Sequence, residues 1–234
     1  MTAAAVVVAT VASYAVALAI GMPLVVPVLN TLASYPFMLS ALRRGRPRDA
    51  ILLMLLWALS MGVCATLIAY AAPWRASAIF LRGDAYRAEM FTWVMTGRGA
   101  ESTPSQFIPQ QAGHAALFVM LALATAGTLA MPMGAVLMNY MGTYVGSLAA
   151  ASRHPAAAML LGWHPWAVIR VASFVALGVV LSAVLLSRAF RFQVDWRFGR
   201  RVIALAACGL VLDVALKAAL APGWQRLLLR VAGW

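Results

Sequence analysis

Charge is scarce in this sequence, and negative charge is scarcest of all. Only 10% of the 234 residues are charged, whereas roughly 25% are charged in an ordinary soluble domain. Hydrophobic residues make up 64% of the chain. A soluble fold of this length could not bury so much apolar surface, so the composition excludes an ordinary soluble domain and indicates a membrane protein.

Cysteine and lysine are nearly absent as well. The two cysteines, Cys64 and Cys208, lie far apart within apolar runs, which excludes a disulfide framework and a zinc-binding spacing. The only lysine is Lys217, so the net charge of +12 comes almost entirely from arginine. Basic loops of membrane proteins follow the positive-inside rule and contact anionic lipid head groups. We therefore expect the lipid bilayer and its anionic head groups as partners, and no nucleic acid.

Motifs that would name a reaction are missing too. The sequence has no paired carboxylates, no Walker loop and no rhomboid-like Gly-x-Ser-Gly. The three histidines, His114, His154 and His164, do not share a metal-ligand spacing. We predict no catalytic residue and no metal site, which argues against an enzyme, and the sequence identifies no cofactor.

Long apolar runs predict an all-α fold, a polytopic integral membrane helix bundle in a bacterial-type inner membrane. A hydrocarbon core of ~30 Å takes about 20 helical residues per crossing. We predict five or six transmembrane helices and one or two interfacial amphipathic helices, within a single membrane domain over residues 1–234. The predicted spans are about 3–30, 51–72, 114–131, 134–150, 165–186 and 202–220.

Two of these spans depend on where helices break. The run 113–150 would be about 57 Å long as one helix, nearly twice the bilayer core. Proline and glycine in the segment 131–134 predict a hairpin of two short spans there, with a single kinked helix as the alternative. At the other end of the chain, Pro222 and Gly223 are predicted to end the last span, and 224–234 is predicted to be a short interfacial helix.

Residues 74–112 carry too many charges for a crossing and form a predicted amphipathic loop. Within it, Tyr86, Met90, Trp93 and Val94 share one helical face, which is typical of a helix lying on the membrane. The following residues, 97–111, are predicted to be irregular.

Arginines suggest the orientation of the chain. With six spans, the loops 43–48 and 188–201 fall on one side and together hold nine arginines. The positive-inside rule then places that side in the cytoplasm and both termini outside. With five spans the two loops fall on opposite sides.

The most informative polar pair is Asp213 and Lys217, in the otherwise apolar segment 202–220. A spacing of four residues puts both side chains on one helical face, where they can pair. Ionisable residues within a span are rare and are candidates for function. A structural role, in which the pair neutralises itself or fixes helix packing, is the alternative. Arg170, one turn inside its span, is predicted to anchor its helix at the interface.

The six residues from Leu212 to Lys217 also resemble part of the last helix of microbial rhodopsins, where an Asp precedes the retinal-binding Lys by one turn. That resemblance implies retinal bound at Lys217. The counterion-bearing third helix and the aromatic-proline motif expected of that family are not present in order, and the predicted spans are fewer than seven.

A second group of candidates lies on the predicted span 134–150. Asn139, Tyr140 and Thr143 lie close together there, with Gly142 and Gly146 in a GxxxG arrangement. Small residues let helices approach closely and hydroxyl groups bond across the contact, so helix packing is one interpretation. The alternative is that the three polar residues line a polar path or binding pocket.

The small size and the lack of catalytic motifs favour a non-catalytic subunit, permease-like or accessory, of a larger transport or envelope complex. Its contacts with other membrane subunits would use the GxxxG helix and the amphipathic loop. The alternative is a self-contained small transporter or channel with a polar site within the membrane. An intramembrane enzyme or pigment-binding protein is a third possibility, for which only the Asp213 and Lys217 pair speaks.

Overall fold

Proline marks the start of five of the ten α-helices in the computed structural model, which describes residues 2–234. Pro47, Pro73, Pro104, Pro155 and Pro165 each occupy the first turn of a helix, where the missing N–H has no helical partner to lose. Seven helices are long: α1 (Thr2–Ile20), α2 (Val25–Arg43), α3 (Pro47–Ala71), α6 (Pro104–Ala124), α7 (Ala130–Ala151), α9 (Pro165–Phe190) and α10 (Trp196–Ala232). The short elements are α4 (Pro73–Ile79), α5 (Gly83–Thr96), the 3₁₀ turn η1 (Ala100–Ser102) and α8 (Pro155–Gly162).

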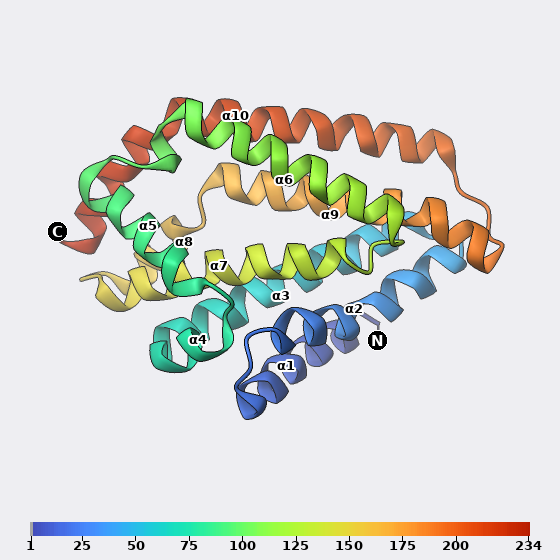
Figure 1. Ribbon diagram of the computed structural model, residues 1–234, viewed down its shortest axis with the longest axis horizontal. Coiled ribbons are helices and arrows are strands. Elements are labelled where there is room, and N and C mark those ends of the chain that lie inside the picture. Colours follow the sequence, from blue (N-terminus) through green and yellow to red (C-terminus); the bar gives the residue numbers. More distant parts are fainter. Residues whose placement is uncertain (1) are drawn as a thin grey trace.

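Six of the long helices, all except α7, are long and apolar enough to cross a membrane. These helices support a multi-pass membrane protein, the class that the composition predicts, and the all-helical prediction is confirmed for residues 2–234. The exception, α7, carries Asn139 and several hydroxyl groups, and most of its residues are buried by the helices around it. It lies in the middle of the bundle, beside α3 (Figure 1).

Consecutive long helices run in alternating directions (Figure 1). The short elements α4, α5 and α8 gather at one end of the bundle. The α2–α3 and α9–α10 connections lie at the opposite end. The bundle has seven long alternating helices, and the six of them that are apolar enough to cross a membrane agree with the five or six spans that the sequence predicts.

The extra helix comes from the first forty residues. The predicted span 3–30 is two helices, α1 and α2, joined by a turn at residues 21–24. Gly21 adopts a left-handed conformation there, with φ +71°, which only glycine takes without strain. Pro23 follows within the same turn. The two helices then pack side by side as a hairpin.

The predicted amphipathic loop 74–112 is wrong in part. It does contain a helix with the predicted buried face, because Met90, Trp93 and Val94 of α5 are nearly inaccessible. That face packs against α7 and α10, however, and does not lie free on a membrane surface. The segment 97–111 is mostly helical, since α6 already begins at Pro104.

The hairpin of α6 and α7 is present, but its turn lies earlier than predicted. The turn covers residues 125–129, where Ala126 and Gly127 both have positive φ. Pro132 instead falls in the first turn of α7, a position that proline tolerates.

Pro222 does not end the last helix. Helix α10 continues through it to Ala232, and its C-terminal part turns across the ends of α5 and α8 (Figure 1). Tertiary contacts offset the hydrogen bond that proline removes. The Gln225 amide donates to the Val94 carbonyl, and Leu228 is buried.

The two arginine-rich loops meet at one end of the bundle. Arg43 lies over the ring of Phe190, 5.2 Å from its centroid, and Arg48 lies over Phe198 at 5.6 Å. The two loops therefore lie together at one end of the bundle, as in the six-span prediction, and not at opposite ends, as in the five-span alternative. Helix α1 runs toward the α4 end and α10 ends there (Figure 1). The start of α1 and the end of α10 therefore lie at opposite ends of the bundle, whereas the six-span prediction has both termini on the same side.

Candidate functional site

A cavity of about 900 Å³ lies between α6, α7, α9 and α10, with parts of its wall from α2, α3, α5 and η1. The four main helices are the green, yellow-green, orange and red ribbons of Figure 1. The volume is at the upper end of the range for small-molecule sites, ~300–1,000 Å³. The cavity is partly open to the outside of the bundle. Its size and position make it the candidate functional site.

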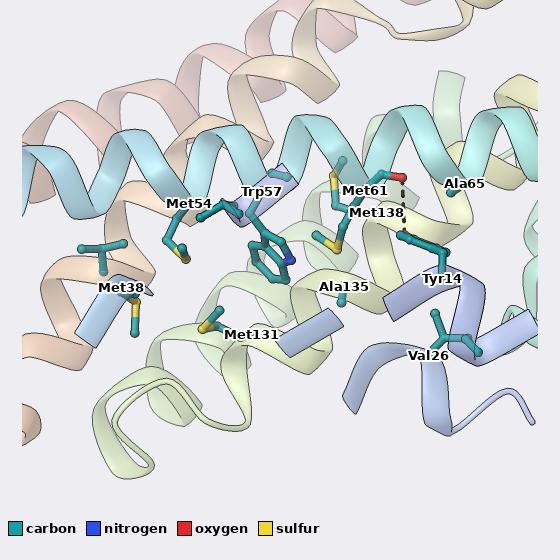
Figure 2. Close-up of a cluster of buried hydrophobic side chains, with 14 of the residues drawn as sticks. Tyr14, Val26, Met38, Met54, Trp57, Met61, Ala65, Met131, Ala135 and Met138 are labelled. Atoms are coloured by element: carbon teal, nitrogen blue, oxygen red, sulfur yellow. Dashed lines mark hydrogen bonds between the residues drawn. The ribbon is translucent and has the colours of Figure 1, made fainter. Parts of the chain in front are cut away.

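Methionine builds much of the apolar part of the wall. Seven methionines line it: Met38, Met54, Met61, Met131, Met133, Met138 and Met141. Figure 2 shows several of them gathered around the indole of Trp57, between α2, α3 and α7. Unbranched methionine side chains have three rotatable bonds and adapt to irregular shapes. This part of the cavity suits a hydrocarbon group, and it can adapt to hydrocarbon groups of different shape.

The other part of the wall is charged, and one ion pair there joins α9 to α10. Arg170 Nε lies 3.1 Å from Asp213 Oδ2. The two groups form an ion pair, but the Arg170 Nε–H is not aligned for a hydrogen bond to the Asp213 carboxylate. Asp213 is only 1% exposed, and its second oxygen, Oδ1, has no hydrogen-bond partner among residues 2–234. A buried carboxylate oxygen without a partner is costly and is suited to accept a hydrogen bond from a bound molecule or water.

A second ion pair joins α10 to η1. The Lys217 ammonium donates a hydrogen bond of 2.7 Å to Glu101 Oε1. The same nitrogen lies 4.6 Å from the centroid of the Phe107 ring, a favourable cation–π distance. The Lys217 side chain is 3% exposed and that of Glu101 is 12% exposed. Such a pair is shielded from solvent, so removal of either member would leave a buried, uncompensated charge.

Asp213 and Lys217 therefore do not pair with one another. They share one face of α10, as their spacing indicates, and both line the cavity. Each has a partner on a different element, so the two charges tie α10 to the rest of the bundle. Arg170 likewise contacts Asp213 and lines the cavity. The sequence predicts that Arg170 anchors its own helix at the membrane interface, whereas in the structure it joins that helix to α10.

Two further groups at the charged end lie outside the long helices. Burial alone would raise the pKa of the Glu101 carboxyl, but Lys217 and Arg170 together hold that pKa below its ordinary value. Burial lowers the pKa of His164 to about 4, against the opposing effect of Glu101. At neutral pH, Glu101 is therefore a carboxylate and His164 is neutral.

Aromatic side chains surround His164. Its ring stacks on Trp166 with centroids 4.7 Å apart and meets Trp93 edge-on at 5.4 Å. The Tyr144 hydroxyl lies 3.4 Å from His164 Nε2. This packing fixes the imidazole at the wall of the cavity, where it offers a neutral hydrogen-bonding group.

The polar residues predicted on α7 separate into different roles. Asn139 bonds to Tyr14 of α1 and to Asn30 of α2, in a buried network that ties the α1–α2 hairpin to α7. The Thr143 hydroxyl donates to the carbonyl of Asn139 in its own helix. Only Tyr140 lines the cavity, where it stacks on Tyr86 at 5.6 Å.

Gly142 and Gly146 lie where α7 approaches α3. A methyl group at Gly142 would collide with Ala65, and one at Gly146 with the Thr66 carbonyl oxygen. Close packing explains both glycines. They are covered within the chain, so the GxxxG surface is not available to another subunit, contrary to the predicted partner contact.

Four residues of the charged end are not among the candidates from the sequence: Arg82, Glu89, Glu101 and His164. The pairing of Arg170 with Asp213 is not predicted either. Glu101 lay in a segment predicted to be irregular, and His164 carried no ligand spacing. No signal in the sequence identifies them, because Asp213 and Lys217 lie one turn apart and could neutralise one another without a charge from another element.

Residues 2–234 contain no group of three or more His, Cys, Asp or Glu side chains that could hold a metal ion. No family model, curated protein or solved structure matches the chain. The fold and site define a multi-pass helical membrane protein with a cavity that is methionine-rich at one end and charged at the other.

Proposed function

We propose that the protein is a small transporter or channel of a bacterial-type inner membrane, which binds its solute in the cavity between α6, α7, α9 and α10. One observation carries this proposal: two ion pairs lie at the wall of a cavity of about 900 Å³. Arg170 pairs with Asp213, and Lys217 pairs with Glu101. Ionisable residues at membrane depth usually line a cavity or substrate path. The role of each ion pair is to hold a charged, ordered surface toward the solute.

The orientation follows from the arginine-rich end. Nine arginines lie in the loops 43–48 and 188–201, which meet at one end of the bundle. The positive-inside rule places that end in the cytoplasm, where it also contacts anionic head groups. Arg170 is five residues from the start of α9, about 8 Å at 1.5 Å per residue. The charged part of the cavity therefore lies near the opposite, non-cytoplasmic end.

Cysteine accessibility tests both the cavity and this orientation. With Cys64 and Cys208 replaced by alanine, Val214→Cys places a thiol at the cavity wall. We expect a water-soluble, membrane-impermeant thiol reagent to label it in intact spheroplasts. Leu205→Cys is the matched control on the same helix, because Leu205 is 72% exposed on the outer face and would contact lipid. Arg46→Cys, at the arginine-rich end, should react only after the membrane is opened.

Failure of Val214→Cys to react under either condition would remove the water-accessible cavity and with it the transport proposal. Labelling of Arg46→Cys in intact spheroplasts would reverse the orientation and leave the cavity untouched. Reaction of Leu205→Cys at the same rate as Val214→Cys would mean that the outer face of α10 is also wet.

A second candidate is a non-catalytic, accessory or permease-like subunit of a larger membrane complex. A surface cleft of about 690 Å³ at the arginine-rich end favours it. Four arginines, Arg46, Arg48, Arg197 and Arg201, line the cleft against two aspartates, Asp49 and Asp195, so its wall is net basic. Such a cleft suits an acidic segment of a neighbouring subunit.

Gentle native purification of the tagged protein from its own membranes, followed by mass spectrometry, tests the subunit proposal. Stoichiometric partner proteins that are lost from Arg46→Ala/Arg201→Ala but retained by Arg226→Ala, at the other end, are the expected result. A chain that elutes alone from wild-type membranes would contradict it.

A further inference from the structure

The charged end of the cavity is electrically balanced. Its wall contains three cationic side chains, Arg82, Arg170 and Lys217. The same wall contains three carboxylates, Glu89, Glu101 and Asp213. A ligand with net charge would leave one charge uncompensated in this partly shielded space. A neutral or zwitterionic ligand keeps the balance.

The wall also contains both hydrogen-bond acceptors and hydrogen-bond donors that have no partner among residues 2–234. Asp213 Oδ1 accepts nothing from residues 2–234, and both polar atoms of the Gln111 side chain, also at the cavity wall, lack partners. Arg170 uses only its Nε toward Asp213, and its side chain is 27% exposed. A head group with one cationic and one anionic part would place its cation at Asp213 and its anion at the Arg170 guanidinium, a geometry that favours strong charge-assisted hydrogen bonds.

From these charges the cavity extends toward the arginine-rich end of the bundle, and its wall there is apolar. The methionine wall includes Met38 near the end of α2 and Met54 on α3, both toward the arginine-rich end of the bundle. A molecule that fills the cavity must therefore be polar at the level of one membrane interface and apolar below it. This is the arrangement of an amphiphile, with its head group near one membrane surface and its chain directed toward the other.

We infer that the cavity binds a zwitterionic, single-chain amphiphile of membrane origin, with its head group at Arg170 and Asp213 and its chain along the methionine wall. The inference rests on the proposed function and specifies its solute class. A volume of about 900 Å³ is within the range of sites for one small molecule, ~300–1,000 Å³, which favours one hydrocarbon chain over two.

Native mass spectrometry of the delipidated protein in detergent tests this inference, with three probes of equal chain length. Lysophosphatidylethanolamine is zwitterionic, lysophosphatidylglycerol is anionic and monoacylglycerol is uncharged. We expect one molecule of the first to bind at least about tenfold more tightly than either other probe, since one hydrogen bond to a charged group supplies that factor. Equal affinity for all three, or a preference for the anionic probe, would overturn the inference.

Two variants and one control separate the head-group and chain parts of the site. Val175→Trp fills the cavity from α9 and should abolish binding, whereas Leu205→Trp, on the outer face, should leave it unchanged. Arg170→Gln/Asp213→Asn removes one charge of each sign and should remove the preference for the zwitterionic probe while chain binding persists. Binding that survives Val175→Trp in a monodisperse protein would place the lipid elsewhere and contradict the inference.

The two proposals fail differently. If Val214→Cys is labelled by the water-soluble reagent but no probe binds, the transporter proposal stands and its solute is not an amphiphile. If Val214→Cys is inert and no probe binds, both proposals fall.

Discussion

Replacement of Gly146 with alanine should destabilise the protein severely. The new methyl group would collide with the Thr66 carbonyl oxygen, and it would also meet the side chain of Ala69. Backbone cannot move aside as a flexible side chain can, so α7 and α3 must separate. Overpacking of this kind lowers the free energy of unfolding by roughly 1–3 kcal/mol, occasionally more. We expect a clearly lower thermal midpoint in detergent and a smaller monodisperse fraction on size exclusion.

Gly113→Ala is the matched control for that variant. Gly113 lies within α6, and a methyl group there meets nothing within 4 Å. Alanine is favoured over glycine in a helix by about 0.5–1 kcal/mol, so this variant should be at least as stable as the wild type. If Gly146→Ala were equally stable, the close approach of α7 and α3 would be refuted.

Neutralising Lys217 alone should be more damaging than neutralising Lys217 and Glu101 together. Lys217→Met leaves the Glu101 carboxylate buried without its partner, a change that typically costs about 3–5 kcal/mol. Lys217→Met/Glu101→Gln removes both charges and should recover most of the loss. Thermal unfolding in detergent, monitored for all three proteins, measures the difference.

The informative control combines the Lys217 substitution with a substitution of the carboxylate that Lys217 does not contact. Lys217→Met/Asp213→Asn removes the two charges that are one turn apart on α10, but leaves Glu101 and Arg170 each without a partner. We expect it to be at least as unstable as Lys217→Met. Recovery in this double variant, and not in the one with Glu101, would mean that Asp213 and Lys217 pair with each other after all.

The pairing of these charges shows how far the sequence could go. A spacing of four residues establishes that Asp213 and Lys217 share a face, and their burial in an apolar helix demands partners. The identity of those partners depends on tertiary contacts. Glu101 is separated from Lys217 by more than a hundred residues of chain, and nothing in the local pattern brings them together.

Helix boundaries show the same limit. Apolar runs located the helical parts of the chain, because the length needed to cross a bilayer is a property of composition. Their ends were less well predicted, since proline has opposite meanings in different positions. The sequence predicts a helix break at Pro132, which lies in a first turn, and a helix end at Pro222, which lies inside a helix. Contacts of the following residues decide between these outcomes, and a single sequence does not show them.

The two parts of the cavity wall differ in how firmly their side chains are held. The side chains of Arg170, Asp213, Lys217 and Glu101 are held in fixed directions by their partners, so under the proposed function they would discriminate sharply among head groups. The methionines opposite them have no preferred outline and rearrange at little cost. If the cavity binds the amphiphile that we propose, it would select the head group narrowly and the hydrocarbon chain loosely, so chains of different length and unsaturation would bind at the same site.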